Sequence, residues 1–375
     1  MRIGIDARMM GGGFGIGRYV EQLILSLQKI DNNNQYILFV KKIDNNKFKS
    51  KNFKQVEADI SWYSWAEQIK LNKIIKREKV DLMHFPHWNI PLFYNGLYIV
   101  TIHDLIMFHF PRPEATTLGP IKFWLKDFVH RIVIRNAVKK AKHIITTSEF
   151  TKDDINKTLG VSMNKMATIY QAPFTTINNL QFTINNDVVL SKHNIVKPYA
   201  LYVGSAYPHK NLDSLLKAWK LFLDKYEVDC QLVLVGKESY FYNNIKESDI
   251  ANRLGNRVIF TGFVDDFDLD LLYKQSKLYI FPSLYEGFGL PPLEAIARGL
   301  PVVSSSSSCL PEVLGEGALY FDPNNIENIA DTINEGLYNE DIRHQLLING
   351  RTELQKYSSE KMAIDTLEIY KKNCG

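Results

Sequence analysis

Two glutamates eight positions apart stand in the second half of the chain, in a setting suited to binding hydroxyl groups. An apolar run enters a turn with Gly287 and Gly289, and a helix is predicted to begin near Leu290, with Glu286 in the turn and Glu294 inside the helix. Backbone N–H groups at a helix start bind anions, and carboxylates accept hydrogen bonds from hydroxyls. The pattern predicts a sugar or ribose site beside a phosphate site. The simpler interpretation is a glycine turn with one capping and one solvated glutamate.

A second combination of strand, glycine turn and helix start lies near residue 204. Gly204 and Ser205 follow an apolar run, and Lys210 comes just before a predicted helix. A lysine there would place a compact cation where a departing diphosphate carries its charge. The alternative is a solvated lysine.

The first glycine-rich loop follows the predicted strand 2–6. Gly13 and Gly15 supply two glycines of a G-x-G-x-x-G fingerprint, but Arg18 occupies the third position. No acidic residue ends a clear second strand about 20 positions later, where the fingerprint requires one. The loop therefore argues against an NAD(P) site.

His103 and Asp104 follow the predicted strand 98–102 directly. The carboxyl edge of an open α/β sheet is where ligands bind, so both are candidate site residues. His84 and His87 are near in sequence, but no carboxylate or cysteine spacing completes a metal site with them.

The glutamate pair and its surroundings resemble the Glu-x7-Glu signature of retaining GT-B glycosyltransferases, family 4 in particular. The segments 299–303, 310–313 and 317–323 resemble the rest of that signature. The resemblance implies that Glu286 lies beside the transferred sugar and that Glu294 binds the nucleotide ribose. It also implies contacts to sugar hydroxyls and phosphate from the backbone N–H groups of Gly287, Phe288, Gly289 and Leu290.

The same resemblance assigns roles to the other motifs. It places His103 near the donor sugar, Lys210 at the diphosphate, and His209 where the family usually has arginine. We predict His103, Lys210 and Glu286 as catalytic residues. The predicted donor-binding residues are Gly15, Gly204, Ser205, His209, Lys210, Phe263, Val264, Glu286, Gly287, Phe288, Gly289, Leu290 and Glu294. The predicted acceptor-binding residues are Gly15, Ile16, Gly17, Arg18, Tyr19 and Asp104.

An aspartate cluster precedes another predicted helix. Asp265, Asp266, Asp268 and Asp270 contain two Asp-x-Asp triplets, which bind a metal and a nucleotide diphosphate in other glycosyltransferases. Carboxylates at a helix start also cap it and favour its dipole, and we predict that role here. No metal and no cofactor is expected, the sugar nucleotide being a substrate.

The composition is that of a globular protein. The 375 residues are 45% hydrophobic and 23% charged, with three widely separated cysteines, no run long enough to span a membrane and no secretion signal. These features predict a cytoplasmic protein without disulfides or a zinc cage.

Charge is distributed unevenly along the chain. Residues 1–180 contain 26 Lys and Arg against 15 Asp and Glu, whereas the remainder contains 19 against 26. The basic half predicts an anionic partner, such as a membrane surface at the inner face of the cell membrane or a lipid diphosphate. Nucleic acid is not expected, because no zinc finger, helix-turn-helix or stacking pattern accompanies the charge. Basic residues gather in the segment 120–143, at Lys122, Lys126, Arg131, Arg135, Lys139, Lys140 and Lys142.

Short apolar runs alternate with amphipathic stretches in both halves, which predicts two parallel α/β sheets. The expected division is an N-terminal acceptor-side domain over 1–175, a polar linker over 176–197 and a donor domain over 198–356. An amphipathic helix in the last segment, 357–375, completes the chain. The resemblance implies the GT-B fold, with two facing Rossmann-like domains and a C-terminal helix that crosses back onto the first.

The resulting hypothesis is a retaining, metal-independent hexosyltransferase of polysaccharide or O-antigen synthesis. It would move mannose from GDP-mannose to a saccharide or lipid-diphosphate-linked saccharide. The favoured mechanism is same-face transfer, and the alternative uses Glu286 as a covalent nucleophile. A UDP-sugar-dependent transferase, a nonhydrolysing sugar-nucleotide epimerase and a silent carbohydrate- or lipid-binding module remain open alternatives.

Overall fold

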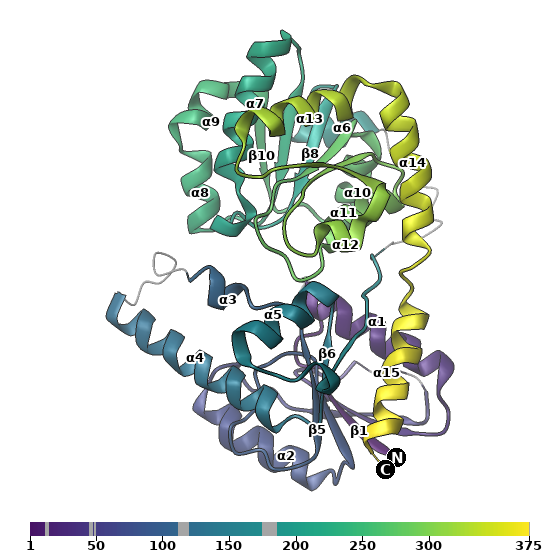
Figure 1. The fold of residues 1–375 in the computed structure, drawn as a ribbon. Coiled ribbons are helices and arrows are strands. Elements are labelled where there is room, and N and C mark those ends of the chain that lie inside the picture. The colour runs from purple at the N-terminus through teal and green to yellow at the C-terminus, as the bar shows by residue number, and fades with distance from the viewer. Residues whose placement is uncertain (12–14, 45–47, 49, 112–119, 175–185, 375) are drawn as a thin grey trace. The chain divides into compact units, whose positions relative to one another are not determined.

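The structure, a computed structural model, describes residues 1–11, 15–44, 48, 50–111, 120–174 and 186–374, and of residues 120–122, 126, 186 and 187 only the backbone (Figure 1). The chain forms two compact units. Unit 1 consists of Met1–Ala172 and Tyr357–Gly375, and unit 2 consists of Pro173–Lys356.

Unit 1 is built on a seven-stranded parallel sheet with the order β3-β2-β1-β4-β5-β6-β7. The predicted strands are confirmed, because buried parallel strands are continuous apolar runs. The strands are β1 (Arg2–Asp6), β2 (Gln35–Val40), β3 (Phe53–Glu57), β4 (Leu82–Phe85), β5 (Tyr98–Ile102), β6 (His143–Thr146) and β7 (Met166–Thr168).

Helices cover both faces of this sheet, because successive side chains of a strand point to opposite faces. Ile37 and Phe39 belong to one core, and Tyr36 and Leu38 to the other. The helical segments of unit 1 are α1 (Gly15–Ile30), η1 (Glu67–Leu71), α2 (Asn72–Arg77), α3 (Ile106–His109), α4 (Pro120–Lys140), α5 (Glu149–Leu159), η3 (Met163–Lys165) and α15 (Ser359–Asn373).

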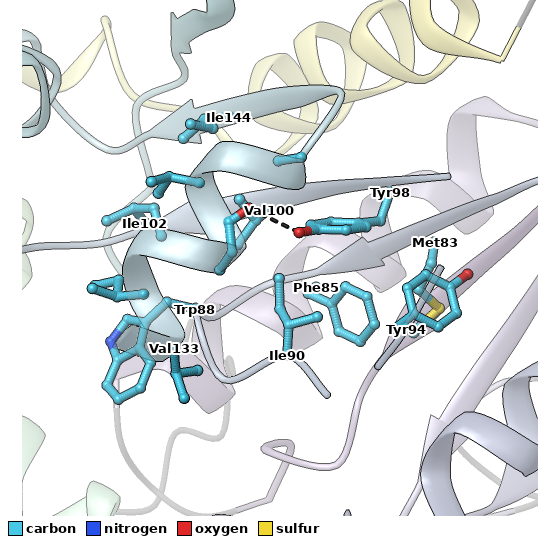
Figure 2. Packing of buried hydrophobic residues seen from close by; sticks show 14 of the residues in the cluster. Met83, Phe85, Trp88, Ile90, Tyr94, Tyr98, Val100, Ile102, Val133 and Ile144 are labelled. Atoms are coloured by element: carbon cyan, nitrogen blue, oxygen red, sulfur yellow. Dashed lines mark hydrogen bonds between the residues drawn. The ribbon is translucent and has the colours of Figure 1, made fainter. Parts of the chain in front are cut away.

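The first core lies between the sheet and helices α2, α4 and α5 (Figure 2). Trp88 lies against Val133 of α4, and the hydroxyl of Tyr98 donates a hydrogen bond of 2.8 Å to the carbonyl of Ala137. This packing fixes α4 beside the ends of β4 and β5.

The terminal helix α15 returns to unit 1 and covers the same face of the sheet as α1. Met362, Ala363, Leu367 and Tyr370 are buried in the second core, together with Tyr19 and other residues of α1. The predicted amphipathic terminal helix and its return to the N-terminal domain are confirmed.

Unit 2 contains a six-stranded parallel sheet with the order β10-β9-β8-β11-β12-β13. The strands are β8 (Tyr199–Val203), β9 (Gln231–Val235), β10 (Val258–Gly262), β11 (Leu278–Phe281), β12 (Val302–Ser305) and β13 (Ala318–Phe321). The helical segments are α6 (Asn186–Lys192), η4 (Pro208–Lys210), α7 (Leu212–Tyr226), α8 (Tyr240–Lys246), α9 (Asp249–Leu254), η5 (Gly255–Arg257), α10 (Asp266–Gln275), α11 (Leu290–Ala297), α12 (Leu310–Leu314), η6 (Gly315–Gly317), α13 (Ile326–Tyr338) and α14 (Glu340–Leu354).

The region predicted as a linker, residues 176–197, includes a helix. Residues 186–192 form α6, in which Val189 and Leu190 are buried. Lys192 at its end forms an ion pair of 2.7 Å with Asp268 of α10. Two adjacent apolar side chains are enough to dock this short helix on unit 2, and residues 176–185 of the predicted linker lie outside the described residues.

Strand order reverses at one point in each sheet. From β8 the chain proceeds outward to β9 and β10, and then crosses to β11 on the other side. In unit 1 the corresponding reversal lies between β1 and β4. Ligands of open α/β sheets bind outside the carboxyl ends of the strands at such a reversal. The loops after β8 and β11 are therefore the expected position of a ligand site in unit 2.

Candidate functional site

Lys210 and Glu286 meet at the strand-order reversal of unit 2. Lys210 Nζ lies 2.5 Å from Glu286 Oε1, and the two side chains are 14% and 10% exposed. They are 76 positions apart in the sequence, in the loops that follow β8 and β11. The structure therefore brings together two residues that we predict to be catalytic, as an ion pair that is not fully buried.

Backbone geometry holds Lys210 in place. Asn211 adopts a left-handed conformation with φ of 59°, which ends η4 and starts α7. The N–H of Leu284 donates a hydrogen bond of 2.8 Å to the carbonyl of His209, which ties η4 to the loop after β11. The His209 side chain itself is buried, 2% exposed, and its ring lies parallel to that of Tyr207.

The turn that carries Glu286 requires both a glycine and a serine partner. Gly289 has φ of 93° at the start of α11, and a Cβ atom there would lie 2.9 Å from the Leu310 side chain. Glycine alone adopts this conformation without strain. The backbone N–H of Glu286 donates a hydrogen bond of 3.0 Å to Ser308 Oγ. Sequence motifs did not reveal Ser308, because its role depends on a contact between two separate loops.

Helix α11 begins at Leu290, as the sequence predicts, and holds the second glutamate. Glu294 is 7% exposed, and Arg298 Nη1 donates a hydrogen bond of 2.9 Å to its carbonyl oxygen. Arg298 also contacts Asp270 Oδ1 at 2.7 Å, which anchors α11 to α10. These contacts hold the backbone of α11 around Glu294, the fifth residue of the helix.

Phe263 and Val264, which we predict to bind the donor, lie at the same edge of the sheet, after β10. The Phe263 side chain is 76% exposed, whereas Val264 is buried at 7%. Since β10 and β8 are separated by one strand, this segment lies about 10 Å from β8 in the sheet direction. Gly204 and Ser205 follow β8, with the carbonyl of Ser205 accepting a hydrogen bond of 2.7 Å from Tyr202.

The aspartate cluster after β10 is engaged by the protein itself. The Asp265 side chain accepts hydrogen bonds from the N–H groups of Phe267 and Asp268, both at 3.0 Å, so its predicted capping role is confirmed. Asp268 pairs with Lys192, and Asp270 with Lys274 and Arg298. In the part of the chain that the structure describes, no three His, Cys, Asp or Glu side chains are grouped to hold a metal ion.

In unit 1, both ring nitrogens of His103 are in hydrogen bonds. Nε2 lies 2.8 Å from the carbonyl of Pro86, so Nε2 carries the proton, and Nδ1 accepts from the Gln171 amide at 2.9 Å. Burial lowers the pKa of His103 to about 4, against the opposing effect of the Pro86 carbonyl. His103 is therefore a neutral, oriented ring whose two nitrogens are engaged by Pro86 and Gln171, and it is poorly suited to accepting a proton. Sequence analysis missed Gln171, which belongs to no motif.

Tyr19 is a core residue in the structure. It is 2% exposed, its hydroxyl lies 3.2 Å from Thr101 Oγ1, and its ring meets that of His103 edge-on at 5.0 Å. We predicted that Tyr19 contacts the acceptor. In the structure its side chain is buried and its hydroxyl bonds to Thr101, so it packs against His103 inside the protein. Thr101 continues the chain of hydrogen bonds to His84 at 2.8 Å, and His84 to Tyr370 of α15 at 2.7 Å.

The remaining residues of the first glycine loop form the start of α1. Gly15 is exposed at the first helical position, Ile16 and Arg18 are half-buried, and Gly17 is buried. Gly13 lies outside the described residues. Asp104 Oδ1 accepts a hydrogen bond of 2.9 Å from the N–H of Ile106, which starts α3.

A buried ion network, also missed from the sequence, lies at the strand-order reversal of unit 1. Arg8 is 1% exposed, and its Nη2 lies 2.7 Å from both Asp6 Oδ2 and Glu67 Oε1. Asn89 donates to Glu67 at 2.8 Å. The network ties the end of β1 to η1 and to the loop after β4, and it lines a small hollow with His87 and Pro86.

The comparisons with known proteins agree on one family. The family model "Glycosyltransferase Family 4" matches residues 15–172, and "Glycosyl transferases group 1" matches residues 189–353. The O-antigen chain mannosyltransferase RfbU of Salmonella typhimurium is 30% identical over 282 residues, which are 72% of each chain.

Solved structures share the fold at low identity. A sucrose-phosphate synthase from Thermosynechococcus elongatus has a TM-score of 0.74 at 19% identity, covering 99% of this chain and 98% of that one. Anabaena HepE, solved with UDP-glucose, has a TM-score of 0.70 at 16% identity, covering 99% of both chains. Together with the sequence matches, these likenesses mean that the chain belongs to glycosyltransferase family 4 and has the two-domain GT-B fold.

Proposed function

We propose that this glycosyltransferase moves a hexose from a sugar nucleotide to a saccharide or lipid-diphosphate-linked saccharide, with retention of anomeric configuration. The observation that carries the proposal is the Lys210–Glu286 pair at the strand-order reversal of unit 2, 2.5 Å apart and not fully buried. A cation and a carboxylate beside a helix start are the groups that a diphosphate and a sugar need.

Each group then has a distinct role. Lys210 exchanges part of its contact with Glu286 for the donor diphosphate and stabilises the charge that grows as the sugar leaves. Glu286 accepts hydrogen bonds from the transferred sugar, and Glu294 from the ribose. The N–H groups from Gly287 to Leu290 donate to hydroxyl and phosphate oxygens.

Retention is explained by transfer on one face of the sugar. The acceptor oxygen forms a bond to the anomeric carbon as the bond from that carbon to the phosphate oxygen breaks, and the acceptor's proton passes to the departing phosphate. The phosphate leaves with the electron pair of the broken bond. Glu286 as covalent nucleophile is the alternative, and its ion pair with Lys210 disfavours it, because a nearby cation makes a carboxylate less nucleophilic.

GDP-mannose is our first choice of donor, supported by the relation to an O-antigen mannosyltransferase. UDP-glucose is the second, supported by the fold shared with a protein solved with that ligand. The test is a thermal-shift titration of the full chain with GDP-mannose, UDP-glucose, UDP-galactose and the free nucleotides. A ligand at 100 times its Kd stabilises the folded state by about 2.7 kcal/mol, so the true donor raises Tm clearly above the others. No shift with any nucleotide sugar would contradict the proposal.

The transfer is proposed to need no metal. Asp265 is used as a helix cap, and Asp268 and Asp270, which belong to the Asp-x-Asp triplets, are in ion pairs with Lys192, Lys274 and Arg298. Lys210 supplies the positive charge that a divalent ion would otherwise provide. The donor-induced Tm shift should therefore persist in excess EDTA, and a shift that needs Mg²⁺ or Mn²⁺ would reject this part of the proposal.

Helix α4 supports a peripheral contact with an anionic membrane. Its exposed face, here called the α4 apolar stripe, consists of Trp124, Leu125, Phe128, Val129 and Ile132, each between 44% and 64% exposed. This spacing puts all five on one side of the helix, and Arg135, Lys139 and Lys140 are exposed nearby. The side chains of Lys122 and Lys126 lie outside those the structure describes. We place the enzyme at the inner face of the cell membrane on this basis.

Among the described helices, none is both long and apolar enough to cross a membrane.

A further inference from the structure

Ser308, in the loop between β12 and α12, has a backbone conformation that serine rarely adopts. Its φ is 57°, in the left-handed region. Among the described residues of unit 2, three other non-glycine residues have a positive φ. Such conformations cost free energy and persist where the surrounding structure enforces them, often at functional sites. One of the other three, Asn211, directly follows Lys210, and Ser308 contacts Glu286, so two of the four flank the ion pair at the strand-order reversal.

The Ser308 side chain binds the backbone of Glu286. Its Oγ accepts a hydrogen bond of 3.0 Å from the Glu286 N–H. Glu286 is 7% exposed and lies in a turn outside any helix or strand, so this side chain supplies the acceptor that regular structure would otherwise provide. The bond is made at the residue whose carboxylate lies 2.5 Å from Lys210 Nζ. Ser308 therefore acts on the ion pair through the backbone that carries one of its members.

A second contact joins the same two loops. A Cβ atom on Gly289 would lie 2.9 Å from Leu310 Cδ2, so the turn after β11 packs closely against the start of α12. Leu310 and Cys309, the two residues that follow Ser308, are both fully buried. Because a packed interior leaves little room for adjustment, these anchors prevent Ser308 from relaxing its φ while its hydroxyl stays at the Glu286 N–H.

The backbone and the side chain of Ser308 favour different residues at this position. Glycine adopts a positive φ without strain, so the backbone alone favours glycine. Glycine has no hydroxyl, however, and would leave the Glu286 N–H without the acceptor that Ser308 provides. The serine keeps a strained backbone together with a hydrogen-bond acceptor, which indicates that the position of Glu286 depends on the hydroxyl.

We propose that Ser308 is a positioning residue for sugar transfer, whose hydroxyl holds the Glu286 backbone so that the carboxylate stays in place beside Lys210. This role rests on the proposed function for the part that Glu286 plays, and it extends the machinery to a third loop, the one after β12. A preorganised group that moves by about 1 Å can lose a large part of its contribution to the rate. Loss of the hydroxyl should therefore lower kcat even where the fold is intact.

Three substitutions separate the hydroxyl from the backbone strain. Ser308→Ala removes the hydroxyl and keeps a Cβ at positive φ, Ser308→Gly removes both, and Ser308→Thr keeps the hydroxyl but adds a β-branched side chain. We expect Ser308→Ala and Ser308→Gly each to lower kcat by about tenfold or more, and Ser308→Thr to stay within about threefold of the wild type. Thermal stability should follow a different order, with the Tm of Ser308→Gly above those of Ser308→Ala and Ser308→Thr by about 2 °C or more.

The rates are measured as nucleotide release at saturating donor, GDP-mannose or UDP-glucose, with a lipid-linked saccharide extract as acceptor. Ser306→Ala removes an exposed serine from the same loop and is the matched control, with kcat and Tm expected to equal those of the wild type.

A second measurement needs no substrate. Hydrogen exchange of the Glu286 amide is followed by NMR of the full chain labelled with ¹⁵N-glutamate, and the signal is assigned from Glu286→Gln. This amide should exchange at least about tenfold faster in Ser308→Ala and Ser308→Gly than in the wild type and Ser308→Thr, because its hydrogen bond is lost only in the first two.

A purely structural role would make kcat follow Tm. Full activity of Ser308→Gly, or a loss in Ser308→Thr as large as that in Ser308→Ala, would therefore overturn the proposal. Unchanged exchange of the Glu286 amide in both Ser308→Ala and Ser308→Gly would overturn it as well. Because exchange is independent of transfer, a wild type that transfers no sugar would contradict the proposed function, while the exchange rates would still decide whether Ser308 holds Glu286.

Discussion

Lys210 is the residue whose removal should have the largest specific effect on transfer. It stabilises charge that is greater in the transition state than in the bound donor, so its contribution should appear in kcat. One preorganised electrostatic group is worth about 10² to 10³ in rate. We expect Lys210→Ala to lower kcat by that factor and to change KM much less, as measured with saturating acceptor.

Two controls make the Lys210 result interpretable. Removing Lys210 leaves Glu286 mostly buried without its partner, so a thermal melt must show that the variant is folded. Lys217→Ala removes an exposed lysine of α7 and should leave both constants unchanged. A raised KM at unchanged kcat would make Lys210 a ground-state binding residue and defeat its leaving-group role.

Glu294 should act on binding more than on chemistry. Its buried position on α11 suits a ribose contact that is the same in the bound donor and the transition state. Loss of a charged hydrogen-bond acceptor costs about 1.5 to 3 kcal/mol, so Glu294→Gln should raise the donor Kd by roughly 10- to 100-fold in a calorimetric titration. Glu316→Gln, at an exposed position, is the control, and a donor Kd within about twofold of wild type in Glu294→Gln would count against the ribose role.

The role of a single residue could be predicted from the sequence only where that residue belonged to a local motif. Lys210, Glu286 and the capping Asp265 stand at helix starts next to turn residues, where the chemistry can be inferred from neighbours in sequence. Gln171 and Ser308 could not be found in this way, because each acts on a residue at least 22 positions distant. The buried Arg8 was also beyond prediction, since arginine is normally a surface residue.

Among the secondary structure elements, the strands buried on both faces were the ones that the sequence predicted. β1, β5 and β8 have the predicted bounds because both of their faces are covered and nearly all of their side chains are buried. β3, with the sequence FKQVE, was missed since it lies at the edge of the sheet and buries only Phe53 and Val56, with no continuous apolar run. β7, at the other edge, is three residues long and gives no periodic signal.

Helix α4 is expected to bind anionic membranes. The full chain should bind anionic liposomes and lose binding as salt is added, with each basic residue near the surface contributing about 1 kcal/mol. Replacing Trp124 and Phe128 with serine should weaken liposome binding by about tenfold or more, because each aromatic side chain then buries less apolar area in the bilayer. Co-sedimentation with liposomes of defined composition measures both effects.

The matched control uses an exposed apolar residue of unit 2. Ile348 on α14 is 46% exposed, similar to Ile132 of the α4 apolar stripe at 44%, and Ile348→Ser should bind like the wild type. Equal binding to neutral and anionic liposomes would reject the electrostatic part of the contact. Unchanged binding by the Trp124 and Phe128 variant would reject the apolar part.

For the molecule as a whole, the two units differ in how they should respond to acid. Burial lowers the pKa of His84 and of His87 to about 3, and that of His103 to about 4. All three histidines belong to unit 1. In the unfolded chain each would titrate near 6.5, so between pH 6.5 and pH 4 the unfolded state binds more protons than the folded state.

The sign of that difference predicts acid instability of unit 1. The stabilisation from the neutral histidines is complete above pH 6.5 and decreases as the pH falls, by about 1.4 kcal/mol per pH unit for each histidine. Urea unfolding followed by tryptophan fluorescence reports mainly on unit 1, which contains Trp62, Trp65, Trp88 and Trp124, whereas unit 2 contains Trp219. The unfolding free energy should fall steeply from pH 6.5 to pH 4.5.

His84→Gln should reduce the slope of the unfolding free energy against pH by about the contribution of one histidine. This holds even if the substitution lowers the unfolding free energy at pH 7.5. His344→Gln removes an exposed histidine of unit 2 and should leave the slope unchanged. A fluorescence-detected unfolding free energy that stays constant between pH 6.5 and pH 4.5 would show that the three histidines titrate alike in both states.

Product analysis with the full chain tests the proposed sugar transfer most directly. EDTA-treated protein is incubated with GDP-mannose, UDP-glucose or UDP-galactose, with and without a lipid-linked saccharide extract, and both nucleotide release and the anomeric configuration of the new linkage are determined by NMR. We expect one donor to release its nucleotide only when acceptor is present, and the product to keep the donor's configuration. Isomerised sugar nucleotide without acceptor, an inverted linkage, or no acceptor-dependent release from any donor would contradict the proposed transfer.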